Sequence, residues 1–467
     1  MVVRIWRKPL KLPKTPPPLA ELLSDTARVG RVVALLGSRH GEPVAASERY
    51  LHWEELVRRP APDGLDAKAW WLALKLQRRQ QSRRVPLVDA AGEAFWFALS
   101  DPIPEHLLRI DQGAAGRIQA TARAMHGEAL PQAITHPETR DRYVIDSIIA
   151  EAITSSQLEG AATTRAVANE MLRSGRSPRD RSERMILNNF QTMQRIGAVR
   201  DKPLTPALVF ELHRLVTDDT LDVPDAAGRF RRPDERVVVG DDYGTVFHTP
   251  PPAETLPERM EAMCAFANGE TPKHFVHPVL RAIIVHFWLA WDHPFVDGNG
   301  RTARALFYWS MLRQGYWLFE FVSISEVITR APTKYGRAFL YTESDENDLT
   351  YFVLYHLEVM EQAIAALHAY IDRQTRQIHE LETHLHATRT FNHRQRALLA
   401  HALRHPGQPY TVAYHQNSHG VVYETARTDL LELAGAGLLT QQKVGRRWEF
   451  RPAPNLAAKL DGAADHA

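Results

Sequence analysis

The residues of this sequence with the clearest chemical meaning lie together in the stretch 293–304, which reads HPFVDGNGRTAR. His293 carries the only side chain there whose ordinary pKa suits a general base at neutral pH. Gly298 and Gly300 allow backbone N–H groups to turn inward, and the helix expected just after them adds the positive end of its dipole. The stretch therefore predicts a cradle for an anion beside a proton acceptor.

Charged and amide side chains in the same stretch suit a phosphate-bearing ligand. Arg301 and Arg304 offer two guanidinium forks that match phosphate oxygens. The carboxylate of Asp297 would repel a phosphate unless a divalent cation lay between the two. Mg²⁺ suits this place, because it favours one carboxylate together with phosphate oxygens. Asn299 can donate an amide hydrogen bond to a phosphoryl oxygen. Each feature alone is common in proteins, but together they predict a site that handles a phosphate-bearing substrate.

This stretch resembles the signature of the Fic family, H-x-F-x-[DE]-G-N-G-R-x-x-R, at every specified position. The resemblance extends to Gly228–Arg231 and His277–Pro278 and covers roughly residues 105–320. It implies a mainly α fold, a Fic-type helical bundle with a β-hairpin flap. It also implies adenylyl transfer, in which AMP moves from ATP to a Ser, Thr or Tyr hydroxyl of a protein and pyrophosphate leaves, with self-modification as one outcome.

The resemblance assigns a role to the positions of the signature. His293 takes the proton of the hydroxyl, Phe295 packs to hold the loop, and Asp297 binds Mg²⁺. Transfer at phosphorus depends more on in-line alignment and charge neutralisation than on covalent chemistry. ATP is therefore the expected substrate and Mg²⁺ the expected cofactor.

The remaining signature residues are implied to bind the triphosphate. Asn299 and the backbone from Gly298 to Gly300 hold phosphates. Arg301 stabilises the leaving pyrophosphate, and Arg304 orients the γ-phosphate. Because the α-phosphorus is attacked, the position of the triphosphate decides whether the reaction occurs.

A second segment, which reads SSQLEG, resembles the inhibitory motif [ST]-x-x-x-E-[GN] of the same family through Ser155, Glu159 and Gly160. In such proteins the glutamate pairs with the second arginine of the signature, here Arg304. A carboxylate in that guanidinium fork denies it to the γ-phosphate, so ATP binds misaligned. The sequence thus predicts an autoinhibited transferase. The alternative role for Glu159 is to orient a water that removes AMP from modified proteins.

A β-hairpin is expected at about residues 235–250, inside an otherwise helical region. Three valines precede the turn GDDYG, and apolar residues follow it. A lone hairpin in a helical domain has no sheet to join, so we expect its edge to be free for another chain. By the resemblance, this hairpin is the flap that positions the protein target. The expected flap residues are Val237, Val238, Val239, Val246 and Phe247.

Composition and periodicity divide the chain into five parts. They are a small N-terminal α+β module at 1–104, the catalytic domain at 105–350, a connecting long helix at 351–388, a winged helix-turn-helix domain at 389–455 and a tail at 456–467. Within the catalytic domain, the inhibitory helix is expected at about 141–160. The N-terminal module resembles one found in some Fic proteins, with weaker motifs.

The expected winged helix carries more basic than acidic residues, which suits a nucleic-acid face. Thr425 and Arg427 are expected on its recognition helix, and Arg446 and Arg447 on its wing, so these four are candidate DNA contacts. Winged helices also dock proteins or dimerise, which leaves a second interpretation open. The expected partners are therefore an unidentified protein target, DNA and a second copy of the chain in a homodimer.

Composition limits the remaining classes of protein. The 467 residues carry 57 Lys+Arg and 55 Asp+Glu, a formal net charge of +2, so no global field marks a nucleic-acid or membrane binder. The single Cys264 cannot form an intrachain disulfide or a Cys-rich metal site, which indicates a reducing compartment. The most apolar stretch, 281–291, is shorter than the ~20 residues that span a bilayer. We therefore expect a cytoplasmic protein with no membrane partner.

Three classes of function stay open from the sequence. The first is an autoinhibited protein adenylyltransferase. The second has the same fold but removes AMP or uses another nucleotide donor. The third is a DNA-binding regulator whose Fic domain only senses ATP, and His293 counts against it because a pure sensor needs no base.

Overall fold

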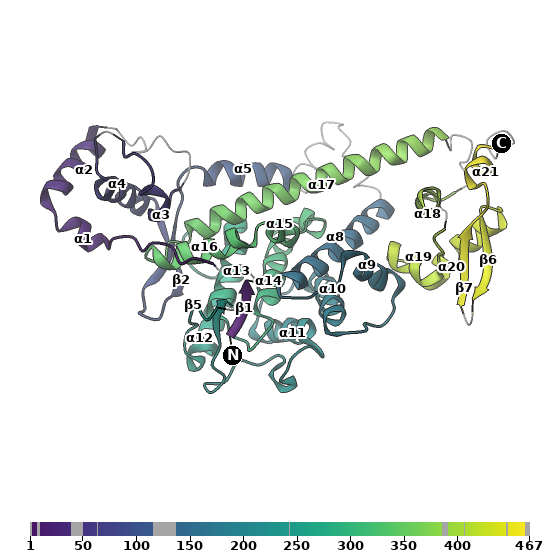
Figure 1. Ribbon diagram of the computed structural model, residues 1–467, viewed down its shortest axis with the longest axis horizontal. Helices are drawn as coiled ribbons and strands as arrows, with labels where there is room; N and C mark the ends of the chain where they lie inside the picture. Colours follow the sequence, from purple (N-terminus) through teal and green to yellow (C-terminus); the bar gives the residue numbers. More distant parts are fainter. Residues whose placement is uncertain are drawn as a thin grey trace.

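The computed structural model describes residues 2–6, 10–38, 50–62, 64–114, 137–241, 243–384, 391–405, 407–444 and 447–462. Over these residues the chain is mainly α-helical with small sheets, as the sequence predicts. Figure 1 shows the N-terminal module at one end, the C-terminal domain at the other and a helical body between them. Within this part of the chain, no helix has both the length and the apolar character that crossing a bilayer takes.

The N-terminal module is a helical cluster followed by a hairpin. Its elements are α1 (Leu19–Leu23), α2 (Thr26–Ser38), α3 (Trp53–Leu56), α4 (Ala67–Gln80), β2 (Ser82–Val88) and β3 (Ala94–Ala98). Strands β2 and β3 pair antiparallel, as the alternating pattern predicts. Trp70, Trp71 and Leu72 of α4 are buried against the other helices of the module, which gives it an apolar core of its own.

The central body consists of helices around one large apolar core. Its α-helices are α5 (Ile103–Ala114), α8 (Pro137–Leu158), α9 (Arg165–Ser174), α10 (Arg181–Val199), α11 (Pro206–Thr217), α12 (Leu256–Ala267), α13 (Pro278–Asp292), α14 (Asn299–Arg313), α15 (Ile324–Arg330), α16 (Pro332–Ser344) and α17 (Thr350–His384). Short 3₁₀ helices lie at Pro224–Ala226, Ala253–Thr255 and Trp317–Glu320. The long helix α17 runs from this body toward the C-terminal domain (Figure 1).

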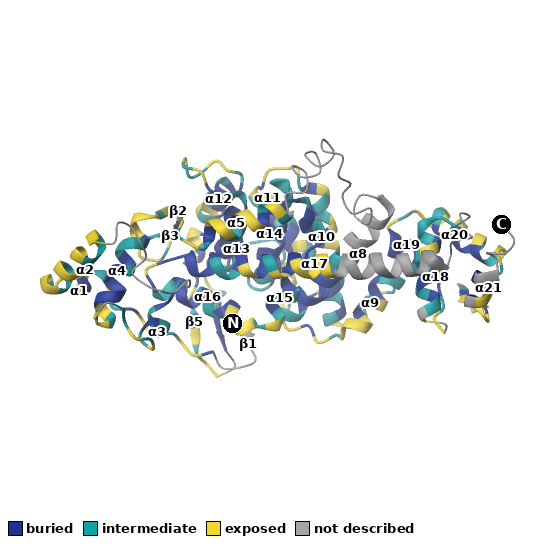
Figure 2. Cartoon of the chain, turned by 90° about the horizontal axis from the view of Figure 1, so that it is seen from above, coloured by how far each residue is buried: buried dark blue, intermediate teal, exposed yellow. Residues whose placement is uncertain are grey.

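Helices α13 and α14 pack together at the centre of the body, and nearly all their residues are buried (Figure 2). A helix that is apolar on every side is stable only when protein surrounds it. Pro278 occupies the first turn of α13, and His277 caps the helix by accepting a hydrogen bond from the Val279 N–H (3.3 Å). The turn that joins α13 to α14 therefore starts and ends on fixed helices.

The flap is not a lone hairpin. Strands β4 (Val238–Asp241) and β5 (Val246–His248) pair antiparallel as expected, but β1 (Val2–Trp6) pairs parallel with β4 on its other side. The expectation of a free edge on β4 is therefore wrong. Parallel pairing joins segments that are distant in the sequence, so β1 leaves no local hairpin pattern from which to predict it.

The C-terminal domain has its own small core, which includes Leu399, Leu430 and Phe450. Its elements are α18 (His393–Arg404), α19 (Val412–His419), α20 (Tyr423–Gly435), β6 (Leu439–Val444), β7 (Arg447–Pro452) and α21 (Leu456–Gly462). Two helices and a strand pair occur in the predicted order, and α19 is an additional helix that the sequence analysis missed. Leu456 and Leu460 of α21 are buried in this core, so the first part of the expected tail is a packed helix.

A buried network of charges joins the N-terminal module to the central body. Lys75 Nζ lies 2.8 Å from Asp345 Oδ1, and the two side chains are only 2% and 1% exposed. Tyr351 donates its hydroxyl to the other oxygen of Asp345 (2.8 Å), and Arg78 donates to the hydroxyl of Tyr351 (3.0 Å). Removing one member of such a buried pair leaves the other charge uncompensated.

We predict that Lys75→Met lowers the free energy of unfolding by about 3–5 kcal/mol, because Asp345 stays buried without its cation. The matched control is Lys68→Met, which removes an ion pair with Glu21 of the same length, 2.8 Å, whose side chains are 46% and 53% exposed. Exposed pairs contribute roughly 0–1 kcal/mol. Urea unfolding followed by tryptophan fluorescence measures both variants, and equal losses would contradict the role of the buried network.

Candidate active site

His293 ends α13 and turns the chain into the signature loop. Its backbone is left-handed, with φ 45° and ψ 57°, and its N–H donates to the Leu289 carbonyl (3.0 Å). Nδ1 lies 3.2 Å from the Ala290 carbonyl, and a carbonyl only accepts, so Nδ1 carries the ring proton. Nε2 is buried and has no hydrogen-bond partner. Burial lowers the pKa of His293 to about 4, so at neutral pH the ring is uncharged with its lone pair on Nε2.

Neighbouring side chains fix the end of this helix. Arg231 Nε donates to the His293 carbonyl (2.9 Å). Arg259 Nε donates to Asp292 Oδ1 (2.8 Å), and Trp288 Nε1 donates to Asp292 Oδ2 (3.0 Å). Asp292, which directly precedes His293, thus ties α12 to α13. Because the backbone is held on both sides of the turn, the ring of His293 keeps one orientation.

The signature loop is held from inside. Phe295 is fully buried and stacks on His213 with ring centroids 3.7 Å apart. Asn299 accepts a hydrogen bond from the Phe295 N–H through Oδ1 (2.9 Å) and donates to the Phe295 carbonyl from Nδ2 (2.8 Å). The structure therefore gives the amide of Asn299 a contact that fastens the loop, and its predicted phosphate contact stays a prediction. Gly298 has φ 82°, and a Cβ there would lie 2.6 Å from Thr217 Cγ2, so the position requires glycine.

Arg301 is buried beside the loop with spare capacity to bind an anion. Its Nη1 donates to the Val216 carbonyl (2.8 Å), whereas its buried Nε has no partner. Burial lowers the pKa of Arg301, which shows that its charge is poorly solvated where it lies. Asp297 Oδ2 is 3.8 Å from Nη2, and the Asp297 side chain is 30% exposed at the mouth of the loop. A phosphate at this place would meet a desolvated guanidinium group.

Two of the three nitrogens of the Arg304 guanidinium bind the segment that the sequence predicts to be inhibitory. Nε donates to Ser155 Oγ (2.8 Å), and Nη2 donates to the Ser155 carbonyl (3.0 Å) and to Glu159 Oε1 (2.7 Å). A Cβ on Gly300 would lie 2.1 Å from Glu159 Oε1, so the glycine is what admits the carboxylate. Gly160 follows with φ 97°, which lets the chain turn away directly after Glu159. Residues predicted from two separate motifs thus meet at Arg304.

A second buried carboxylate anchors α8 against α14 and α15. Glu151, only 1% exposed, accepts hydrogen bonds from the hydroxyls of Tyr308 (2.9 Å) and Ser323 (2.8 Å). It also accepts from the N–H (3.1 Å) and the hydroxyl (2.5 Å) of Ser325. Since Ser155 follows Glu151 by one helical turn, this network sets where the inhibitory segment meets Arg304.

A small cavity of about 50 Å³ opens beside His293, Asp297 and Glu159. The rest of its wall comes largely from side chains that the sequence analysis missed. These are His248, Trp291, Tyr335, Phe339, Leu340 and Glu343. His248 had a signal, because it lies near the end of the predicted hairpin and is followed, after Thr249, by three prolines. The residues of α16 had none, since their spacing from the signature carries no pattern and only the tertiary fold brings them to the cavity.

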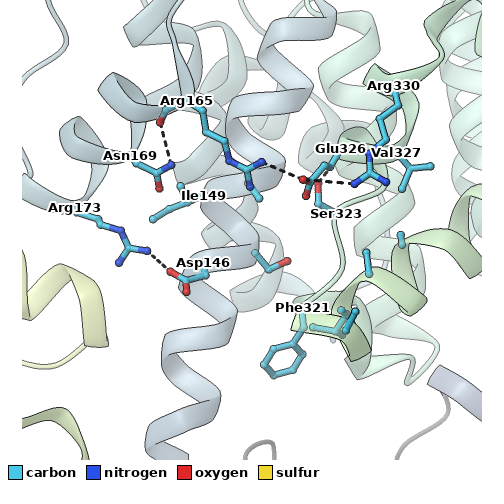
Figure 3. A pocket seen from close by; sticks show the side chains of 16 residues that line it. Asp146, Ile149, Arg165, Asn169, Arg173, Phe321, Ser323, Glu326, Val327 and Arg330 are labelled. Carbon is cyan, nitrogen blue, oxygen red and sulfur yellow. Dashed lines mark hydrogen bonds and ion pairs between the residues drawn. The ribbon is translucent and has the colours of Figure 1, made fainter. Parts of the chain in front are cut away.

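A larger cavity of about 540 Å³ lies between α8, α9, α15 and α17 (Figure 3). None of the described residues that line it belongs to the predicted site. Its charged groups pair with one another: Asp146 binds Arg173, and Arg165 Nη1 lies 3.1 Å from Glu326 Oε1. The cavity is therefore separate from the chemistry of the signature loop.

The flap residues fall into two groups in the structure. Val237, Val239 and Phe247 are buried, at 5%, 6% and 8% exposure, and Val239 and Phe247 line the small cavity. Val238 is half-buried and Val246 is exposed. The flap thus contributes one apolar wall of the candidate site.

The candidate DNA contacts lie at the surface of the C-terminal domain. On α20 Thr425 is half-buried and Arg427 is exposed, and Arg447 at the start of β7 is exposed. Arg446 lies outside the described residues. These positions leave DNA binding a prediction.

Residues 203–311 match the model of the Fic/DOC family. Curated relatives include "Protein adenylyltransferase Fic" from Nematostella vectensis, 30% identical over 158 residues (34% of this chain, 33% of the relative), and its namesake from Drosophila grimshawi, 34% identical over 158 residues (33% and 30%). The match thus spans about a third of the length of each relative.

Solved structures that are similar include a Fic family protein from Desulfovibrio desulfuricans G20, with TM-score 0.45, 18% identity and coverage of 77% of this chain and 98% of that one. A Fic domain containing signaling protein from Bacteroides thetaiotaomicron VPI-5482 has TM-score 0.39, 20% identity and coverage of 48% and 87%. The family match includes the complete signature loop with its buried histidine and both arginines. The chain therefore contains a Fic/DOC family domain, and residues 293–304 are its signature.

Proposed function

We propose that this protein is an adenylyltransferase that moves AMP from ATP to a Ser, Thr or Tyr hydroxyl of a protein, itself included, and that Glu159 restrains it at rest. The observation that carries this proposal is the buried, neutral His293, which has an unpaired Nε2, lines a small cavity and lies in the same stretch as the buried Arg301 and Arg304. A base next to an anion site is what hydroxyl attack on a phosphate ester needs. The names of the curated relatives support the same activity.

The reaction follows from these groups. The hydroxyl oxygen attacks the α-phosphorus of ATP, and His293 Nε2 takes the hydroxyl proton. The bond from the α-phosphorus to the bridging oxygen of the β-phosphate breaks, so pyrophosphate leaves with its electron pair. Arg301 offers a desolvated guanidinium to the negative charge that develops there. Alignment is the main requirement, because the attacking and leaving oxygens must lie in line.

Asp297 is the residue that would hold Mg²⁺. Its carboxylate is partly exposed and lines the cavity. Among the residues that the structure describes, no group of three or more His, Cys, Asp or Glu side chains could hold a metal ion. This donor set fits Mg²⁺ bound by one protein carboxylate with the other ligands from phosphate and water. When bound, the ion neutralises phosphate charge.

The proposed inhibition by Glu159 depends on the contacts of Arg304. Ser155 and Glu159 occupy its Nε and Nη2, and the cavity beside them, about 50 Å³, is far below the ~300–1,000 Å³ of ligand pockets. The triphosphate therefore cannot reach Arg304 while Glu159 is in place. Displacing Glu159, or removing it, opens the guanidinium to the γ-phosphate.

We predict that Glu159→Gly raises the incorporation of labelled AMP from ATP by roughly 10- to 100-fold. In this variant the γ-phosphate can bind Arg304, which aligns the α-phosphorus with the attacking hydroxyl. The measurement is self-modification with radiolabelled ATP. Glu159→Gln is the matched control, because it keeps the shape of the side chain but loses its charge. Its rate should lie between those of the unaltered protein and Glu159→Gly.

An unchanged or lower rate for Glu159→Gly would refute the restraint. The alternative, removal of AMP, is tested on the modified product. If the unaltered protein strips AMP from it and Glu159→Gly does not, then Glu159 orients a water and the protein is an eraser.

We predict that His293→Ala, made in the Glu159→Gly background, loses transfer by roughly 100-fold or more while it still binds ATP. Calorimetric titration with ATP checks binding, and labelled AMP checks transfer. Full transfer by this variant would refute the assignment of the base.

The pH dependence gives a second measure of the same assignment. Burial lowers the pKa of His293 to about 4, so the ring stays neutral and basic as the pH falls to about 5 and is protonated only below that. The kcat/KM for ATP of Glu159→Gly should therefore decline near pH 4, not near the ordinary value for histidine of about 6.5. A decline centred on 6.5 would show that the base is a solvated histidine.

We predict that Glu151→Gln weakens the restraint. The amide can donate but cannot accept all the hydrogen bonds that Tyr308, Ser323 and Ser325 give to the carboxylate, so α8 loses its register against α14. AMP incorporation should rise about 3- to 10-fold over the unaltered protein, a change worth about 0.7–1.4 kcal/mol. In the Glu159→Gly background the same substitution should add nothing, because the restraint is already gone. An equal rise in both backgrounds would show that Glu151 acts elsewhere.

A further inference from the structure

The edge of the flap sheet is occupied by the chain's own N-terminal segment. Strand β1 pairs parallel with β4, with Val2 opposite Val238, Val3 opposite Val239 and Arg4 opposite Gly240. Because β5 pairs with the other side of β4, both backbone edges of β4 are taken. An extended segment of another protein can therefore reach β4 only by replacing one of these strands.

A second contact places the same segment against the wall of the active site. Leu10 is 5% exposed and packs in a cluster with Val239, Phe247 and Leu340. These three partners all line the small cavity that contains His293. The segment is thus held by backbone pairing at β4 and by one apolar side chain beside the cavity.

The composition of this segment suits a chain that occupies the flap but has no hydroxyl group to accept AMP. Residues 1–14 contain no Ser, Thr or Tyr, and the first hydroxyl is that of Thr15. An extended segment laid along the flap is the geometry in which a target hydroxyl would approach His293. The N-terminal segment takes this position without an alcohol to modify.

We propose that β1 and Leu10 form a pseudosubstrate strap, which holds the place of an extended target segment along β4 and must leave before a protein target binds. The inference rests on the proposed function, in which the flap positions the target. Strand exchange costs little, because an incoming strand replaces the backbone hydrogen bonds that β1 gives up. The partner that fits is an extended segment, parallel to β4, that carries a hydroxyl and an apolar side chain for the position of Leu10.

The strap and the Glu159 restraint act on different substrates. Glu159 binds Arg304, where the triphosphate would lie, whereas the strap covers the flap, where the protein would lie. Substituting Glu159 should therefore free the nucleotide site and leave the strap in place. Binding at the flap can accordingly be measured without ATP.

The test uses the full chain and a fluorescent synthetic peptide with the sequence of residues 1–12. The variant is Val3→Pro/Arg4→Pro. Successive N–H groups of a strand point to opposite sides, so one of these two residues donates a hydrogen bond to β4, and replacing both with proline removes that donor. The attached strap competes at an effective concentration of order millimolar, so its release should strengthen peptide binding about tenfold or more. Fluorescence anisotropy measures this change. The matched control, Lys14→Pro, places a proline at an exposed position outside the strand and should bind the peptide as weakly as the unaltered protein.

Hydrogen exchange gives the second readout. The β4 amides should lose protection in Val3→Pro/Arg4→Pro and regain it when the peptide is added, but not with a scrambled peptide of the same charge. Equal peptide binding by the variant and the unaltered protein, binding by neither, or unchanged protection of β4 would each overturn the strap. The peptide has no hydroxyl and the assay has no ATP. A negative result in this assay would therefore contradict the strap but not the proposed AMP transfer. Negative results with the His293 and Glu159 variants would contradict the transfer but not the strap.

Discussion

The charge of Arg304 is the constraint on which the rest of the site depends. This guanidinium is 1% exposed, and a buried cation without a partner costs several kcal/mol. Burial alone would lower the pKa of Arg304, yet its neighbours, Glu159 foremost, raise the pKa overall. Glu159 can therefore leave only when another anion takes its place. In the proposed reaction the γ-phosphate of ATP is such an anion, so the residue that pairs with Arg304 here is also the one that the substrate would replace.

His293, the proposed base, is in the opposite situation. Around His293 the protein offers an apolar helix and a carbonyl for Nδ1, but nothing for Nε2. The unmet hydrogen bond and the left-handed backbone both cost stability, which the packing of α13 and α14 offsets. The site thus combines an ion-paired arginine of α14 with a histidine at the end of α13 whose Nε2 lacks a hydrogen bond. A ligand that supplies negative charge and a hydroxyl would satisfy both.

The sequence was informative where chemistry is local and uninformative where the fold assembles distant segments. The loop 293–304 could be predicted because its base, glycines and arginines are contiguous. Pairing of Glu159 with Arg304 was predicted from the family motif, since no spacing rule joins those positions. Tyr335 and Leu340 reach the cavity only through the packing of α16, and β1 pairs with a strand far along the chain, so neither had a local signal. Helix α19 was missed because its second half, HQNSH, is polar and lacks an apolar repeat.

The role of Asn299 shows a different limit. Residue type alone allowed its amide to reach a phosphate, but the same amide can also bridge the two backbone groups of Phe295, and the folded loop uses it so. A tight turn leaves backbone N–H and C=O groups without partners, and a side chain at the helix start is the nearest group that satisfies both. Asn299 therefore keeps the backbone of the loop in the shape that would present its amides and the arginines to the proposed phosphate ligand.

The two contacts that close the site differ in what can open them. The Glu159–Arg304 pair lies in a poorly solvated place, with side chains 12% and 2% exposed, so salt screens it little and only a competing anion relieves it. The β1–β4 pairing consists of backbone hydrogen bonds, which any extended segment reproduces whatever its charge. An anionic nucleotide is thus suited to the first contact and an extended polypeptide to the second. Each substrate of the proposed reaction therefore has the chemistry to displace one of the two contacts. Because Glu159 and β1 are separate parts of the chain, neither substrate needs the other to bind first.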